Sequence, residues 1–278
     1  MSQRIAALAA YFFRSLLFSL TGVIYVILGF AYWAIMFPPG QNTPDASYYI
    51  LVLAAFGVGL TFLAALSLAS RANQAAYVSW IVRLPSRGEY VTAVFLATIL
   101  FAGLVQLLVA ALALYRGPDL TAGQIAVIPP VWLSLNVLTA VLALHATDFV
   151  TKGWSRVVLF GILALFLFGQ SLSHAASSSS WIIIRLNSLS RAAIGQGWLV
   201  LVTPINTFSQ WLQNDGSTSL GNFFSLPFWP FHAIADAIVA GSFTETQALA
   251  PAILLLYATL LIMLAVDLLA TKDLDLTE

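Results

Sequence analysis

Apolar stretches of about 20 residues recur along this chain, and they limit its fold more than any other feature. Residues 49–69 and 90–115 contain no charged side chain at all. A run of about 20 apolar residues is what a helix needs to cross the hydrocarbon layer of a membrane. Only 8% of the 278 residues are charged and 60% are hydrophobic, whereas a water-exposed surface carries roughly 25–35% charge. The sequence therefore predicts a multi-pass membrane protein and excludes a soluble enzyme.

The apolar stretches predict six transmembrane helices in an all-α membrane protein. The expected spans are about 15–37, 49–69, 90–115, 131–145, 157–172 and 249–270. Tyr and Trp residues mark several of their ends, as is typical of membrane interfaces. We expect one transmembrane permease domain over residues 1–278, with an interfacial helix at 1–14, a cytoplasmic loop at 72–88 and an external segment at 176–247. An alternative for the first segment is that it simply lengthens the first span.

The basic residues predict the orientation, because cytoplasmic loops carry an excess of Lys and Arg. With six spans and a cytoplasmic N-terminus, most of the eleven basic residues lie inside. The cytoplasmic set is Arg4, Arg14, Arg71, Arg83, Arg87, Lys152, Arg156 and Lys272; the external set is Arg116, Arg185 and Arg191. We expect a bacterial-type inner (plasma) membrane, with the N- and C-termini both cytoplasmic.

The stretch 181–202 is apolar enough to suggest a seventh span, but Arg185 and Arg191 interrupt it. Each arginine at mid-span costs about 2.5–3.5 kcal/mol on insertion scales. We therefore expect a re-entrant or interfacial pair of short helices. The prolines of 227–230 predict further breaks between interfacial pieces.

The loop between the second and third spans carries a short amphipathic pattern. Tyr77, Trp80, Ile81 and Leu84 share one helical face, and Pro85 ends the pattern. Such a helix either lies passively on lipid or docks a cytoplasmic partner.

This loop resembles the coupling-helix loop of type-2 ABC (ATP-binding cassette) exporter permeases. The matching segment is Leu84-Pro85-Ser86-Arg87-Gly88-Glu89-Tyr90, which precedes a long apolar span. The chain end, Leu268-Leu269-Ala270-Thr271-Lys272-Asp273-Leu274-Asp275-Leu276-Thr277-Glu278, is also similar to the end of that family. The resemblance covers essentially the whole chain.

The resemblance implies an ABC exporter permease that works with a separate cytoplasmic ATPase subunit and a second copy or homologue of itself. Contact with the ATPase would involve Tyr77, Trp80, Arg83 and Leu84, while Arg87 and Glu89 would fix the turn into the third span.

No catalytic or cofactor motif is found in the chain. It has no Gly-x-x-x-x-Gly-Lys-Ser/Thr loop, and lysine occurs only at positions 152 and 272. We therefore expect no enzyme activity and no cofactor in this chain, with ATP and Mg²⁺ bound by the partner ATPase. The three histidines lie too far apart in this topology to hold a haem or a metal. Gly169-Gln170-Ser171 superficially resembles a serine-protease site, but the last span offers no histidine as its base.

A mildly polar face on the first span includes Thr21, Tyr25, Gly29 and Tyr32. It either packs against a neighbouring helix or lines a substrate path. Gln170 and His174 form a second polar patch at the external end of the fifth span. Neither patch is strongly charged, so the expected substrate is hydrophobic or amphiphilic. The alternative function is a non-catalytic structural subunit of a larger respiratory or photosynthetic membrane complex.

Overall fold

The computed structural model describes residues 2–38, 45–74, 84–115, 117–151, 154–169, 181–213 and 217–271. Over these residues the protein contains helices and connecting segments but no strand. The helices are α1 (Ser2–Leu17), α2 (Leu20–Met36), α3 (Ala46–Ala72), α5 (Arg87–Leu114), α6 (Ala122–His145), α7 (Trp154–Gly169), α8 (Trp181–Gly195), α9 (Leu199–Trp211), α10 (Ser217–Ser225), η3 (Leu226–Phe228), α11 (Trp229–Ala240), η4 (Gln247–Leu249) and α12 (Ala250–Thr271). The expected all-helical fold is confirmed for the described part of the chain.

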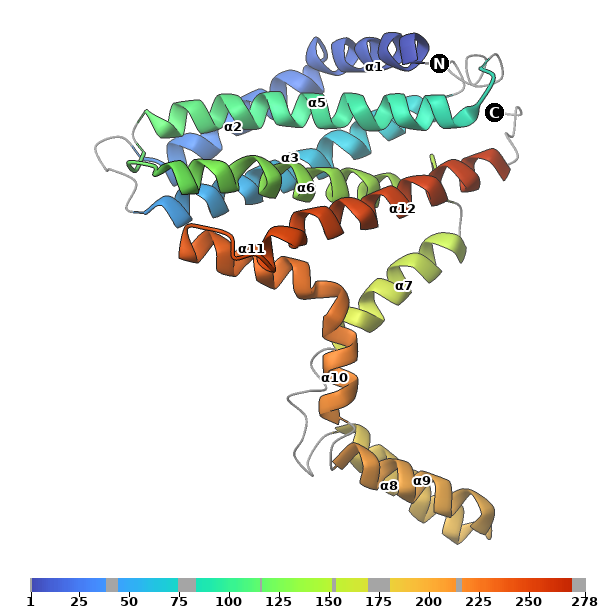
Figure 1. Cartoon of the computed structure of the whole chain (residues 1–278). Coiled ribbons are helices and arrows are strands. Elements are labelled where there is room, and N and C mark those ends of the chain that lie inside the picture. The colour runs from blue at the N-terminus through green and yellow to red at the C-terminus, as the bar shows by residue number, and fades with distance from the viewer. Residues whose placement is uncertain are drawn as a thin grey trace. The chain divides into compact units, whose positions relative to one another are not determined.

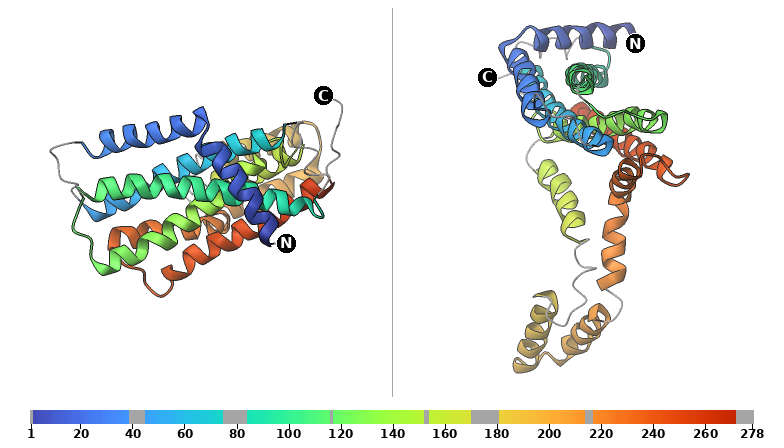
Figure 2. Two further views of the ribbon diagram at one scale, coloured as in Figure 1. Left: turned by 90° about the horizontal axis from the view of Figure 1, so that it is seen from above. Right: turned by 90° about the vertical axis from the view of Figure 1, so that its left-hand side faces the viewer.

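The chain forms two compact units. One contains residues 1–156 and 230–278, and the other contains residues 157–229. In the first unit α3 packs on α5 and α6, α12 packs on α6 and α5, and α1 lies across α5 (Figures 1 and 2). The prediction of one permease domain over the whole chain stays a prediction.

Five helical stretches of the described chain are long and apolar enough to cross a membrane. They are Ala46–Ala72, Arg87–Leu114, Ala122–His145, Gly221–Ala240 and Gln247–Thr271, and the bent pair α1–α2 makes a sixth if it counts as one span. The predicted spans 49–69, 90–115 and 249–270 correspond directly to α3, α5 and α12. The protein therefore has the architecture of a multi-pass membrane protein.

The fourth predicted span begins earlier than expected. The sequence suggested a start after Pro129-Pro130, but α6 starts at Ala122 and contains both prolines. A capping box explains this start, because Thr121 accepts from the Gln124 N–H while the Gln124 side chain accepts from the Thr121 N–H. Helix-breaking residues are tolerated inside transmembrane helices when neighbouring groups satisfy the freed carbonyls.

Two further expectations, the span 157–172 and the breaks around 227–230, also differ in part from the structure. The predicted span 157–172 corresponds to α7, a 16-residue helix that is shorter than a typical span. The region around Pro227 and Pro230, predicted as a break, consists of α10, η3 and α11 in succession, and its stretch Gly221–Ala240 is long and apolar enough to cross. Pro227 lies at the start of η3 and Pro230 in the first turn of α11, where the missing N–H removes no helical bond.

The first predicted span is divided near Phe18-Ser19 rather than at Arg14. α1 and α2 meet at 69°. Ser19 caps α2 by accepting from the Gly22 N–H at 3.1 Å. A Cβ atom at Gly22 would lie 2.0 Å from the Leu16 carbonyl oxygen, so the bend requires glycine there. α1 is thus a separate helix, as an interfacial N-terminal helix requires.

The second unit contains a helical hairpin of α8 and α9, joined through Gly197 at φ = +74°. Ser190 Oγ donates to Asn206 Oδ1 at 2.7 Å, and Ser209 Oγ donates to Asn187 Oδ1 at 3.1 Å. The region 181–202, predicted as a pair of short helices, thus consists of α8 and the start of α9. Arg185 and Arg191 are both exposed.

Candidate functional site

The start of α5 is tied to the end of α12. Ser86 caps α5 by accepting from the Gly88 N–H at 3.2 Å. Arg87 Nη1 donates to the carbonyl oxygens of Leu269 at 2.9 Å and Ala270 at 3.3 Å. The last carbonyls of a helix have no partner within the helix, and a cation there satisfies them and complements the helix dipole. Arg87 therefore joins two helix ends that lie far apart in the sequence.

Gly88 brings the same two helices close together. A Cβ atom at this position would lie 2.9 Å from Cγ1 of Val266 on α12. A larger residue at position 88 would push α5 away from α12 and would lengthen the hydrogen bonds of Arg87.

Tyr90 joins the start of α5 to three further elements. Its side chain is fully buried, and its hydroxyl donates to the Ala72 carbonyl oxygen at the end of α3 at 3.0 Å. Its ring meets Phe12 of α1 edge-on at a centroid distance of 5.4 Å and packs against Phe149 at 5.8 Å. Tyr90 thus holds α1, α3 and the segment after α6 against α5.

Arg71 lies at the end of α3, on the other side of residues 75–83 from Tyr90, and it also makes contacts with the helix bundle. Its Nη1 donates to the Ser15 carbonyl oxygen at 2.8 Å, and its Nη2 donates to Thr21 Oγ1 at 3.3 Å. One guanidinium at the end of α3 therefore holds both sides of the α1–α2 bend. We call residues 71–74 and 84–90, with these contacts, the α3–α5 junction.

The α3–α5 junction flanks the predicted coupling segment. Tyr77, Trp80 and Arg83 lie outside the described residues. Leu84 is half-buried against the hydrophobic core. Glu89 is buried, and its Oε2 has no hydrogen-bond partner among the described residues. Its place in the first turn of α5 puts its carboxyl group at the positive end of the helix dipole.

The polar residues of the first predicted span all contact α3. The Tyr25 hydroxyl donates to the Leu63 carbonyl oxygen at 3.1 Å and lies 2.6 Å from Ser67 Oγ. The Tyr32 hydroxyl donates to the Val52 carbonyl oxygen at 2.8 Å. Together with the bond from Arg71 to Thr21, these contacts serve helix packing. A role of Thr21, Tyr25 and Tyr32 in a substrate path stays a prediction, and the predicted path residues Gln170 and His174 lie outside the described residues.

Two buried amides connect α3, α5 and α6 in the apolar core. Gln106 Nε2 donates to the Leu53 carbonyl oxygen at 2.9 Å, and Asn136 Nδ2 donates to Gln106 Oε1 at 2.6 Å. The Gln106 amide lies directly against Gly57 of α3. The contact between them was not predicted, although the sequence carries a signal for it: each is the sole Asn or Gln in its predicted span, and an isolated polar group in a membrane needs a partner.

His145 and Asp148, near the end of α6, contact residues close to them in the sequence. His145 is fully buried, and its Nδ1 donates to the Val141 carbonyl oxygen at 2.9 Å. Asp148 forms an ion pair with Arg156. Within the ranges that the structure describes, no three His, Asp or Glu side chains gather closely enough to hold a metal ion.

Comparisons with known proteins gave no match: no protein-family model, no curated protein and no solved structure is similar to this chain.

Proposed function

We propose that this chain is the membrane-spanning permease subunit of an ABC transporter, driven by ATP hydrolysis on a separate cytoplasmic subunit. The contacts of the α3–α5 junction are the observation that best supports this proposal. The described segments before and after residues 75–83 are bound to the helix bundle through Arg71, Arg87 and Tyr90. The sequence resemblance to type-2 ABC exporter permeases gives the identity of the partner.

If a partner moves a loop, the movement changes the transporter only when the loop transmits it to the membrane helices. Discrete, tightly packed contacts transmit a displacement, whereas a freely hinged loop does not. In this protein a displacement of the loop would act on α5 directly, on α12 through Arg87 and on α1 through the Tyr90–Phe12 contact. A passive surface loop has no need of three such attachments.

The partner supplies the chemistry that this chain lacks. Its ATPase would bind ATP and Mg²⁺ and would contact Tyr77, Trp80, Arg83 and Leu84, the face that the sequence predicts for docking. A second copy or homologue of the permease would complete the transporter. The exposed apolar face of α2, which includes Ile24, Ile27 and Leu28, suits contact with lipid or with that second permease.

We propose export of a hydrophobic or amphiphilic substrate. Thr21, Tyr25 and Tyr32 would then lie beside its path when the α2–α3 contacts open. The described spans carry no ring of acids or bases that would suit a strongly charged substrate or an ion.

Affinity purification of the full-length chain from its native membrane tests the proposal. We expect an ATPase with a Walker-type phosphate-binding loop to co-purify. Trp80→Ala combined with Arg83→Glu should remove it. Trp211→Ala combined with Arg191→Glu is the matched control, because both residues are exposed and belong to the segment that the sequence predicts to be external. Co-purification with respiratory or photosynthetic subunits and no ATPase would overturn the proposal in favour of a structural subunit.

A further inference from the structure

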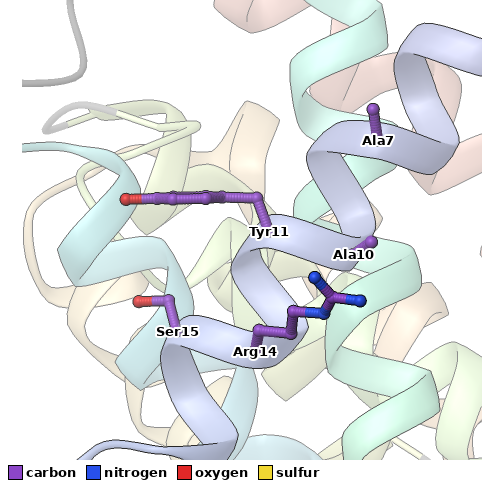
Figure 3. Close-up of a pocket in the computed structure, with 5 residues that line it drawn as sticks. All are labelled: Ala7, Ala10, Tyr11, Arg14 and Ser15. Atoms are coloured by element: carbon purple, nitrogen blue, oxygen red, sulfur yellow. The ribbon is translucent and has the colours of Figure 1, made fainter.

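The exposed side of α1 carries a hollow lined by Ala7, Ala10, Tyr11, Arg14 and Ser15, with a volume of about 640 Å³ (Figure 3). In this view the Arg14 side chain extends toward Ala10, while the side chains of Tyr11 and Ser15 point to the other side of α1. The opposite side of α1 is buried through Ala9, Phe12 and Leu16. The hollow therefore belongs to the face of α1 that the bundle leaves uncovered.

The electrostatic environment of this hollow is positive. Arg14 lines the hollow, and α1 contains no acidic residue. The Arg71 guanidinium also reaches the edge of the hollow, where it binds the Ser15 carbonyl oxygen. The Arg14 backbone carbonyl accepts from the Phe18 N–H. The Arg14 guanidinium makes no hydrogen bond or ion pair within the described part of the chain, so it is available to a ligand. A guanidinium binds a phosphate through two parallel hydrogen bonds.

The hollow lies near the ends of two long apolar helices, α3 and α5. α1 crosses over α5 near the start of that helix, where Phe12 meets Tyr90 (Figure 2). Arg71, which contacts Ser15, lies in the last turn of α3. The hollow is thus level with the ends of two helices long enough to span the membrane, which is where the phosphates of a bilayer are found.

We propose that the hollow on α1 binds the headgroup phosphate of an anionic phospholipid. Arg14 holds the phosphate, and Ala7 and Ala10 leave room for the glycerol portion. Tyr11 provides the amphipathic ring that is typical of membrane interfaces. The lipid would hold α1 in the plane of the membrane surface and would thereby support the α1–α2 bend.

Native mass spectrometry of the full-length chain, purified in detergent and titrated with dioleoylphosphatidylglycerol or dioleoylphosphatidylcholine, tests the proposal. We expect the anionic lipid to bind about fivefold more tightly than the zwitterionic one, as a basic residue at a membrane surface provides. Arg14→Gln should abolish this preference. Ala10→Leu, which keeps every charge but fills the hollow, should abolish it as well.

Arg4→Gln is the matched control, because it removes the same charge from an exposed position of α1 that does not line the hollow. It should keep the wild-type preference. An equal loss in Arg4→Gln would show diffuse attraction and would overturn the proposal, as would an unchanged preference in Ala10→Leu. Displacement of the bound lipid by excess inorganic phosphate would assign the hollow to a soluble anion instead. The experiment contains no ATPase, so its failure would leave the proposed transport function unaffected.

Discussion

Arg87 and Leu269 are separated by 182 residues in the chain, yet the guanidinium of one donates to the carbonyl oxygen of the other at 2.9 Å. This bond joins the first residue of α5 to the last turn of α12. In the proposed transporter, it is the contact through which the predicted coupling loop acts on the last span.

Replacing Arg87 tests that contact. Arg87→Gln should lower the free energy of unfolding by about 1 kcal/mol, because a charge-assisted hydrogen bond at a partly exposed site is lost. The same variant should keep its ATPase partner but lose most of the transport that ATP hydrolysis drives. Stability can be measured by thermal unfolding in detergent, and coupling by transport in proteoliposomes. Full coupling in Arg87→Gln would show that α12 receives its movement by another route.

Tyr90→Phe isolates the hydroxyl that joins α5 to α3. The ring contacts with Phe12 and Phe149 remain, while the Ala72 carbonyl oxygen loses its donor. The expected cost is about 1 kcal/mol in a buried setting. Tyr90→Ala should cost about 3–5 kcal/mol, because the buried ring is lost as well. Thermal unfolding of both variants checks the difference, and equal costs would assign the whole effect to the hydroxyl.

Gly57→Ala should destabilise the bundle by about 1–3 kcal/mol, because its Cβ would lie 2.3 Å from the present position of Gln106 Nε2. Gln106 cannot move aside without losing its bonds to Leu53 and Asn136. Gly59→Ala is the control, since nothing lies within 4 Å of its added Cβ, and it should be neutral or stabilising. If Gln106→Ala does not relieve the defect of Gly57→Ala, the steric explanation is wrong.

Asp45 makes the start of α3 sensitive to acid. Its carboxylate accepts from the hydroxyl and the backbone N–H of Ser47, and these hydrogen bonds lower the pKa of Asp45 below its ordinary value. A carboxyl whose pKa is lower in the folded protein stabilises it above the unfolded pKa, and the contribution disappears as the pH falls through the folded pKa. Asp45→Asn should therefore unfold at a lower temperature than wild type at neutral pH and converge with it in strong acid. Asp119→Asn, in the loop before α6, provides the control for charge alone.

The long spans could be predicted from the sequence because hydropathy alone determines them. α3, α5 and α12 each contain an apolar run long enough to cross a membrane. The start of α6 was not predicted, because Pro129 and Pro130 are stronger local signals than the capping box of Thr121 and Gln124. The bend between α1 and α2 depends on the close approach of Gly22 to Leu16, which no periodicity reveals.

The candidate site was predictable only in part, because its contacts join residues that lie far apart in the chain. The motif from Leu84 to Tyr90 indicated where the junction lies. It could not indicate that Arg87 bonds to Leu269 or that Arg71 bonds to Ser15. Such long-range bonds depend on how the helix ends meet, and that arrangement is a property of the packed bundle.

Cross-linking at Trp80 is the most direct test of whether residues 75–83 bind a cytoplasmic ATPase. A photoreactive phenylalanine analogue would replace Trp80 in the full-length chain, and cross-linked partners would be identified by mass spectrometry from native membranes. We expect the cross-linked partner to carry a Walker-type phosphate-binding loop. The amount of cross-linked product should change when ATP is added. Cross-links to lipid or to integral membrane subunits alone would contradict the proposal.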